Sequence, residues 1–236
     1  MNIFHFVTVI LISFSLVSVA EAQDKNAGPQ NKDFVFTGKP TEFQDYGYLV
    51  RGAAWVFEPG QEEVIFVCWE NPTEFNKDAR GWVKDQVEKT WQLHTPIKFK
   101  GWQTCAQQNS GIRIIWRDEG ARVNEFGRYI DGVPQGMILN DTFKAWNQDC
   151  QGMREFCVRS IAVHEFGHAL GFAHEQNRPD TPGECSLQHG QGQQEEDMLT
   201  PYDPDSVMNY CNQKYNNNGL LSPLDIKAAQ AVYGKP

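Results

Sequence analysis

Three histidines within one short segment constrain the fold of this 236-residue chain more than any other feature of its sequence. The segment reads His164-Glu165-Phe166-Gly167-His168-Ala169-Leu170-Gly171-Phe172-Ala173-His174. His164 and His168 are four residues apart, so on a helix their side chains lie one turn apart on the same face. His174 comes six residues later, which on a continuous helix is about 9 Å further along the axis and off that face. The helix must therefore end and the chain turn back if all three imidazoles are to meet.

Gly171 lies where this reversal is required, and glycine adopts the left-handed conformation at little cost. The three imidazoles would then occupy three corners of a tetrahedron and leave the fourth corner open. Such an open site is typical of catalytic zinc, whereas structural zinc sites are closed. Glu165 follows the first ligand, where its carboxylate can reach a water on the metal without binding the metal itself. The segment therefore predicts one catalytic zinc ion held by the three histidines, with Glu165 as the general base.

Two other interpretations of this segment are open. The first is an ordinary helix that binds no metal, because a bare HExxH pattern arises by chance. The longer HExxHxxGxxH pattern constrains more positions and is therefore less often accidental. Half of the 6 histidines in the chain fall inside it, which favours a metal site over a chance arrangement. The second alternative is a domain that binds zinc but has lost its activity, and the presence of Glu165 argues against it.

Two later segments add to the histidine pattern. Directly after the third histidine the chain reads Glu175-Gln176-Asn177-Arg178-Pro179-Asp180, and further on it reads Ser206-Val207-Met208-Asn209-Tyr210. These segments resemble the metzincin metallopeptidases, and among them the astacins. Astacins carry a glutamate after the third histidine, then a run with arginine and aspartate, and a methionine-containing Met-turn followed by a tyrosine. The matrixin branch lacks the glutamate and the tyrosine, and the close resemblance covers about residues 157–210.

The resemblance implies roles for two further residues. In astacins the tyrosine after the Met-turn is an additional zinc ligand that swings to stabilise the transition state, so Tyr210 is expected to be both a metal ligand and a catalytic residue. Glu175 has two open interpretations. It forms a salt bridge at the surface or at a helix end, or, as in the family, it pairs with a new N-terminus, for which residues 51–53 offer a cut. The aspartate that keeps many astacins latent is absent, because the nearest match carries Lys39 instead.

An α+β fold of the metzincin, zincin-type class is what the resemblance implies. It has a twisted mixed β-sheet with a backing helix and the zinc helix in an N-terminal lobe, and a mostly irregular C-terminal lobe that ends in a helix. Apolar runs with β-branched residues predict strands at Val64–Trp69, Ile97–Trp102, Ile112–Trp116 and Gly136–Leu139. The last of these would lie at a sheet edge, where an extended substrate would pair with it as an added strand.

Helices are predicted from apolar periodicity and capping residues. Apolar side chains at every fourth position predict a helix over about Lys77–Leu93, and the zinc helix should run over about Arg154–Leu170. Ser222, with Pro223 and Asp225 after it, predicts the start of a terminal helix. Structure should begin near Trp55, and the polar stretch from 179 to 204 should be a loop.

The N-terminus predicts export. Residues 3–19 are almost all apolar and Ala20-Glu21-Ala22 suits signal peptidase, so residues 1–22 are interpreted as a signal peptide, with an uncleaved anchor as the alternative. Residues 23–52 would be a pro-segment or leader, and residues 53–236 the catalytic domain. The 6 cysteines then predict disulfides in a secreted, extracellular protein, or a periplasmic one in transit. Sequence alone does not choose among the 15 possible pairings; the one we expect is Cys150–Cys157, Cys185–Cys211 and Cys68–Cys105.

The net charge of −9 argues weakly against nucleic acid or an anionic membrane as a partner. We expect a protein or peptide substrate, no nucleic acid, and no membrane contact beyond the signal peptide. The sequence makes no prediction of the oligomeric state. The sequence thus predicts a secreted zinc metalloendopeptidase that acts on extended protein substrates. The alternatives are a binding module on an inactive metallopeptidase scaffold and a zinc hydrolase that acts on a non-protein bond, such as one in a cell wall.

Overall fold

The computed structural model describes residues 48–107, 110–185 and 196–236, all within one compact unit that spans Glu42–Pro236. The predicted signal peptide, residues 23–47 of the predicted leader and the segment with Lys39 lie outside the described residues. No helix in the described ranges has both the length and the apolar content that a bilayer span requires.

A five-stranded sheet forms the centre of the N-terminal lobe, in the order β3-β2-β4-β6-β5. Its strands are β2 (Val64–Trp69), β3 (Lys98–Thr104), β4 (Ile112–Trp116), β5 (Arg122–Val123) and β6 (Met137–Leu139). Strand β2 pairs in parallel with β3 and β4, and β4 pairs in parallel with β6, whereas β5 is antiparallel to β6. The predicted mixed sheet is confirmed, and each predicted strand is present with nearly the expected bounds.

The prediction that the strand at 136–139 lies at the sheet edge is wrong. Strand β5 pairs with β6, with Arg122 opposite Ile138 and Val123 opposite Met137, so β5 is the edge strand. Strand β5 was not predicted, because two residues are too few to display the alternation by which a strand is recognised. Its place in the sheet comes from antiparallel pairing with β6.

The single helix predicted over 77–93 is two helices. Helix α1 covers Lys77–Lys89 and helix α2 covers Trp91–His94. Thr90 separates them, and its hydroxyl donates to the carbonyl of Gln86 at 2.7 Å, in competition with the backbone. Trp91 donates its indole N–H to the carbonyl of Val163 at 2.8 Å, which anchors the indole against the zinc helix. The break therefore follows from a local side-chain bond and a distant anchor.

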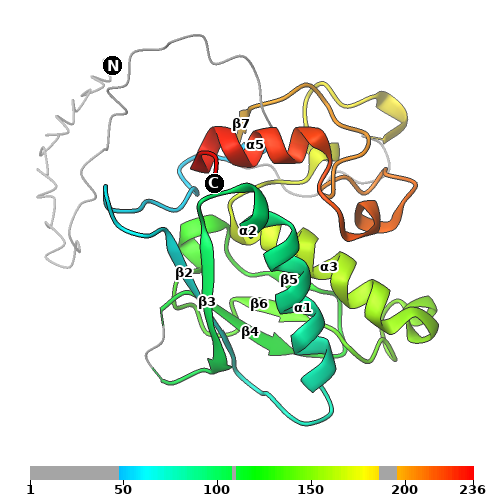
Figure 1. Cartoon of the computed structure of the whole chain (residues 1–236). Helices are drawn as coiled ribbons and strands as arrows, with labels where there is room; N and C mark the ends of the chain where they lie inside the picture. Colours follow the sequence, from blue (N-terminus) through cyan, green and yellow to red (C-terminus); the bar gives the residue numbers. More distant parts are fainter. Residues whose placement is uncertain (1–47, 108–109, 186–195) are drawn as a thin grey trace, which may run out of the picture. The chain divides into compact units, whose positions relative to one another are not determined.

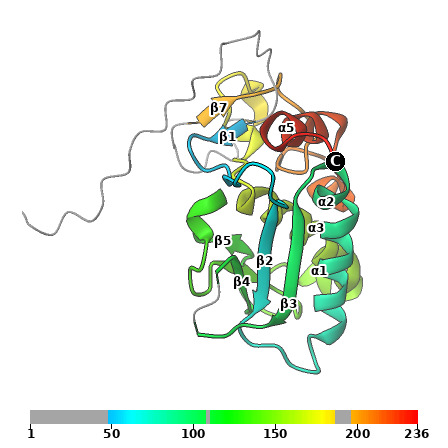
Figure 2. The same ribbon diagram turned by 60° about the vertical axis from the view of Figure 1, so that its left-hand side comes forward.

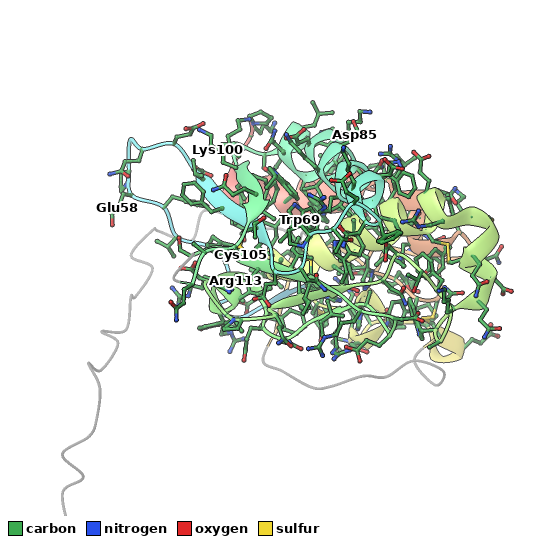
Figure 3. All side chains as sticks on the ribbon, turned by 90° about the horizontal axis from the view of Figure 1, so that it is seen from below. Glu58, Trp69, Asp85, Lys100, Cys105 and Arg113 are labelled. Carbon is green, nitrogen blue, oxygen red and sulfur yellow. A yellow bond between two sulfur atoms is a disulfide. The ribbon has the colours of Figure 1, made fainter. Side chains whose placement is uncertain are left out.

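Helices α1 and α3 (Arg154–Ala169) lie together on one face of the sheet (Figure 2). The buried side of α1 carries Ala79, Val83 and Val87, as the periodicity predicted. Trp69 lies inside the domain, whereas Glu58 extends from a loop at its periphery (Figure 3). The ring of Trp69 stacks on that of Trp116, with centroids 5.6 Å apart. Both tryptophans belong to the same hydrophobic core as the apolar side chains of the zinc helix.

The C-terminal lobe, which follows Gly171, is mostly turns and short 3-10 helices, as expected, and ends in α5 (Pro223–Tyr233). Strand β1 (Tyr48–Val50) pairs antiparallel with β7 (Glu196–Met198), and both lie beside α5 (Figure 1). The expected beginning near Trp55 is therefore wrong, and so is a wholly irregular 179–204 stretch. Residues 48–50 are buried because they form backbone bonds with segments far along the chain, which local patterns do not report.

Three disulfides connect the 6 cysteines, in the pairing that was expected. Cys68–Cys105 joins β2 to the end of β3, and Cys150–Cys157 joins the 3-10 helix η2 (Gln148–Met153) to the first turn of α3. Cys185–Cys211 ties the loop after the histidine segment to the chain after the Met-turn. The irregular lobe thus has a covalent link of its own.

Candidate metal centre

The zinc helix ends as the histidine spacing required. Helix α3 stops at Ala169, and Gly171 adopts φ of 97°. The N–H of Gly171 donates to the carbonyl of His168 at 2.8 Å, and that of Phe172 donates to the carbonyl of Gly167 at 3.0 Å. This pair of bonds is a Schellman cap, in which a left-handed glycine satisfies the last helical carbonyls. The reversal predicted at Gly171 is confirmed.

The structure brings the three predicted ligands together. Nε2 of His174 lies 3.2 Å from Nε2 of His164 and 3.0 Å from Nε2 of His168. One ligand atom from each histidine lies within 4.8 Å of the others, and two of the three side chains are buried. The three rings therefore converge on one point at the boundary between the two lobes.

Backbone carbonyls fix the orientation of two of the imidazoles. Nδ1 of His164 donates to the carbonyl of Val207 at 2.8 Å, and Nδ1 of His168 donates to the carbonyl of Phe172 at 2.7 Å. Because a carbonyl only accepts, the proton lies on Nδ1 and the lone pair on Nε2. In metal sites such carbonyl partners hold the ring and select the nitrogen that binds.

The environment also keeps the imidazoles neutral. Burial lowers the pKa of His164 to about 4, against a smaller opposing effect of the Val207 carbonyl. Burial, with His164 nearby, lowers the pKa of His174 to about 3, and burial lowers the pKa of His168 well below its usual range. Neutral imidazoles are the form that binds a metal, so at neutral pH no proton has to be displaced.

Zinc fits this donor set. Imidazole nitrogens bind zinc at about 2.0–2.1 Å in a tetrahedron, which places two of them roughly 3.4 Å apart. The Nε2 separations of 3.0 and 3.2 Å are close to that value. Three neutral nitrogens with an open fourth position are the donor set of a catalytic zinc site.

Glu165 lies beside the centre on α3 and is buried. Its Oε2 has no hydrogen-bond partner among the described residues. Burial raises the pKa of this carboxyl to about 8, against smaller opposing effects of the Arg122 charge and of a bond from the Val123 backbone. A buried carboxylate with an unused oxygen can accept a proton from a group at the metal centre.

The Met-turn approaches the zinc helix where the helix has no side chain. A Cβ added to Gly167 would lie 2.4 Å from Sδ of Met208, so the thioether lies against bare helix backbone between the two helical histidines. The ring of Tyr210 lies 4.4 Å from that of His174 and 5.2 Å from that of His164, measured between centroids. Burial raises the pKa of Tyr210, so its hydroxyl keeps its proton.

A family model described as "Astacin", which is a peptidase family, matches residues 61–235. The chain belongs to the astacin family. Residues 61–235 are therefore a zinc metallopeptidase domain, and catalytic zinc is its cofactor. The α+β fold expected from the resemblance is confirmed.

Several curated relatives are named zinc metalloproteinases. The chain is 42% identical to the zinc metalloproteinase nas-36 of Caenorhabditis briggsae over 155 residues, which cover 56% of this chain and 25% of that protein. It is 29% identical to the zinc metalloproteinase dpy-31 of Caenorhabditis elegans over 140 residues, which cover 53% of this chain and 21% of that protein. The matched region thus spans only about a fifth to a quarter of these relatives' own length.

Two solved structures share the fold. Myroilysin superposes with a TM-score of 0.54 and 20% identity, over 80% of this chain and 100% of that chain. High choriolytic enzyme 1 of Oryzias latipes superposes with a TM-score of 0.54 and 19% identity, over 78% of this chain and 96% of that chain. At such identities the likeness concerns the fold alone.

Glu175 of this astacin domain is not at the surface. It is buried, and its Oε1 lies 3.4 Å from Nε of Arg178 and accepts the N–H of Asp203 at 2.8 Å. Burial raises the pKa of Glu175 to about 8, against the smaller opposing effect of Arg178. The salt-bridge interpretation therefore holds with a correction: the bridge is internal, because the 3-10 helix Glu175–Asn177 turns its first residue inward.

Two residues that hold the Met-turn were not predicted from the sequence. Gln176 accepts the backbone N–H of Tyr210 at 3.0 Å. Asp225, predicted only as a capping residue, also accepts the hydroxyl of Ser206 at 2.6 Å and the N–H of Val207 at 2.9 Å. The cap at Ser222 is confirmed and ties α5 to the Met-turn through the same carboxylate. No local pattern reveals this second use.

A cavity of about 380 Å³ lies beside the histidines and shares His164, Glu165 and Tyr210 with the metal centre. The whole cavity is called the side pocket. Its other walls come from Ala121, from Ile161 of α3, from the segment before α3 and from the Met-turn with the segment after it, and Trp146 and Tyr215 are the largest of these side chains. Trp146 thus forms part of the wall of this cavity.

Proposed function

We propose that this chain is a secreted zinc-dependent endopeptidase that cleaves extended protein substrates. The observation that carries the proposal is the convergence of three neutral imidazoles beside a buried carboxylate that has an unused oxygen. Membership of the astacin family supports peptide-bond hydrolysis, and the names of the relatives refer to longer proteins. Their substrates and partners do not transfer to this chain.

His164, His168 and His174 would hold the zinc, with Tyr210 close enough to join them. Bound zinc supplies a Lewis acid that acidifies a water and polarises a peptide carbonyl. Glu165 would take a proton from the attacking water and return it to the leaving amine, so its protonation state is restored after each turnover. Its position suits this role, because Glu165 is buried beside His164 and its Oε2 has no other partner among the described residues.

Tyr210 would donate a hydrogen bond to the substrate oxygen as negative charge develops there. Its protonated hydroxyl and its place beside the rings of His164 and His174 support this role. In the Tyr210→Phe variant we expect kcat to fall by about 10²–10³-fold, with KM little changed, because the lost bond forms in the transition state. Equal loss in kcat from Tyr215→Phe, which alters a tyrosine further from the histidines, would contradict a specific role.

The substrate would pair with β5 and not with the strand at 136–139. Strand β5 has a strand neighbour on one side only within the sheet, and the backbone of Val123 bonds to Glu165. An extended peptide added along β5 would therefore run past the metal centre. This assignment replaces the pairing with β6 that the sequence suggested.

Secretion rests on the predicted signal peptide at residues 1–22, and the three disulfides suit an oxidising compartment. The division into a leader at 23–52 and a domain at 53–236 stays a prediction. The packing of β1 argues for a domain that includes residues 48–52. Ala53 is fully buried, and its N–H donates to the carbonyl of Val50 at 3.0 Å, so a cut near residues 51–53 would separate bonded neighbours.

Casein digestion tests the proposal directly. We expect the purified chain to cleave casein, to stop when a chelator removes zinc, and to resume when zinc is restored. A chain that binds zinc in equimolar amount but cleaves neither casein nor a mixed peptide library would be an inactive scaffold. Cleavage of a cell-wall polymer without cleavage of peptides would favour the non-protein hydrolase instead.

A further inference from the structure

The side pocket adjoins the reacting centre, because His164, Glu165 and Tyr210 form one of its walls. A peptide whose scissile bond lies at the histidines must therefore direct a neighbouring side chain toward the pocket. The cavity of about 380 Å³ is within the size range of pockets that enclose a small ligand. It has room for a large side chain beside the peptide backbone.

The remaining walls, as far as the described residues form them, are neutral. Trp146, Ile161 and Ala121 contribute apolar surface, and Tyr215 adds an aromatic ring. The other lining residues are four asparagines: Asn147, Asn209, Asn212 and Asn216. Among the described lining residues none is a lysine, arginine or aspartate, and the carboxylate of Glu165 lies at the metal end.

A charged substrate side chain would find no counter-ion in these walls. Arg122, whose charge acts on Glu165, is not a lining residue, and its guanidinium donates to the Gly120 carbonyl at 3.1 Å and to Glu119 at 3.3 Å. Glu165 is committed to proton transfer. Burial of an unpaired charge is strongly unfavourable, whereas burial of apolar surface against tryptophan and isoleucine is favourable.

The pocket walls are held in place before a substrate arrives. Nδ2 of Asn147 donates to the hydroxyl of Tyr215 at 3.2 Å, which links two segments 68 residues apart. Asn147 and Asn216 both have positive φ, of 54° and 42°, a conformation that asparagine adopts more readily than most residues. The Cys150–Cys157 disulfide fixes the segment after Asn147 to α3. A preformed wall loses little conformational freedom on binding.

We infer that the side pocket selects a large uncharged side chain, aromatic or aliphatic, at the substrate residue next to the scissile bond. The inference rests on the proposed endopeptidase function and assigns a substrate class to it. Trp146, Ile161 and Tyr215 determine the preference by contact, and the asparagines determine it by the absence of charge. Acidic and basic side chains are rejected at that position.

Cleavage-site profiling with a mixed peptide library and the zinc-loaded full chain tests this directly. At one position adjacent to the cut we expect Phe, Leu, Met or Tyr to be favoured over Asp, Glu, Lys and Arg by at least about tenfold. A preference for charged residues at that position, or no preference at either adjacent position, overturns the inference.

A charge placed in the pocket sharpens the test. Asn212→Arg should raise the cleavage of peptides with Asp or Glu at the selected position by about tenfold relative to Phe. Gln213→Arg adds the same charge one residue away, on an exposed side chain that is not a lining residue, and should leave the profile unchanged. If the Asn212 variant does not fold, Ala121→Arg introduces the charge from another wall. If the cleavage preference shifts equally in the pocket variant and in the control variant, selectivity would come from the overall electrostatic field at the protein surface, and the inference would be overturned.

Binding separates this inference from the proposed function. Calorimetric titration of the zinc-loaded Glu165→Gln variant with short peptides that differ only by Phe, Asp or Lys at the selected position needs no turnover. Selective binding of the Phe peptide by this variant, together with no cleavage of any peptide by the zinc-loaded wild-type chain, would sustain the pocket and refute the peptidase. Cleavage by the wild-type chain, with equal binding of the three peptides by the variant, would sustain the peptidase and refute the pocket.

Discussion

The two halves of the metal centre are held by different forces. His164 and His168 lie on α3, a regular helix of which 12 residues are buried. His174 and the Met-turn belong to irregular chain that is held by Glu175, Gln176 and Asp225 through hydrogen bonds. Apolar packing spreads its stabilisation over many contacts, whereas a few directional bonds concentrate it. The geometry of the irregular half should therefore be disturbed more easily by loss of a single stabilising contact than the geometry of the helical half.

The largest expected effect concerns the helical half. Glu165→Gln should lower kcat/KM by about 10²–10⁴-fold, because the amide accepts no proton, while zinc content stays near one per chain. Peptide hydrolysis and metal analysis on the same sample measure both. The matched control is Glu155→Gln, an exposed residue on the same helix, which should be fully active. Wild-type turnover in the Glu165 variant would remove this residue from the mechanism.

Next in size is a comparison of two disulfides. Removal of Cys185–Cys211 or of Cys68–Cys105 by paired serine substitutions should each cost about 2–4 kcal/mol in the free energy of unfolding. Only the first pair lies in the irregular lobe, and Cys211 directly follows Tyr210. We therefore expect kcat, measured well below the unfolding transition, to fall only in the Cys185/Cys211 variant. Denaturant unfolding and steady-state kinetics test this, and equal kcat losses in both variants would erase the distinction between the lobes.

The junction between the halves is tested at Gly167. Gly167→Ala drives a methyl group into Sδ of Met208, so we expect a loss of about 1–3 kcal/mol in the free energy of unfolding and weaker zinc binding. Gly81→Ala, in α1, meets nothing within 4 Å and should instead stabilise the chain by about 0.5–1 kcal/mol. Competition with a chromogenic chelator gives the zinc affinity. A Gly167 variant with unchanged affinity would mean that the Met-turn does not support the centre.

The smallest effect depends on pH. Arg178 forms two bonds of 2.8 Å to Asp180, and this hydrogen bonding lowers the pKa of Asp180 below its usual range. A carboxyl whose pKa is lower in the folded state stabilises the fold above about pH 4 and loses that contribution as the pH falls through its folded pKa. Since Asp180 is partly exposed, Asp180→Asn should cost only about 1 kcal/mol or less at pH 7.

Denaturant titrations at several pH values check this prediction. The difference between Asp180→Asn and the wild type should shrink toward zero as the pH is lowered below about 4. The control is Asp149→Asn, an exposed residue before α3, which should show little difference at any pH. A difference that persists unchanged at pH 3 would indicate that Asp180 acts by packing and not by charge.

Local sequence patterns predicted the features that depend on neighbouring residues. The spacing of the histidines predicted a helix, a stop and a reversal at Gly171, because helical geometry allows no other way for three rings to converge. Apolar runs predicted β2 and β4 with their observed bounds, and Ser222 with Asp225 predicted the start of α5. These elements follow from side-chain periodicity and capping within a few residues.

Contacts between distant residues decided the rest. The edge strand β5, the pairing of β1 with β7 and the second use of Asp225 arise from segments that meet only after folding. The side pocket is of the same kind, because Asn147 and Tyr215 bond across 68 residues. The sequence by itself determined that three imidazoles and a carboxylate could form a zinc centre. Only the tertiary structure decided which neutral side chains line the pocket beside it. These side chains come from segments far apart in the sequence, and local sequence patterns do not report which distant segments meet.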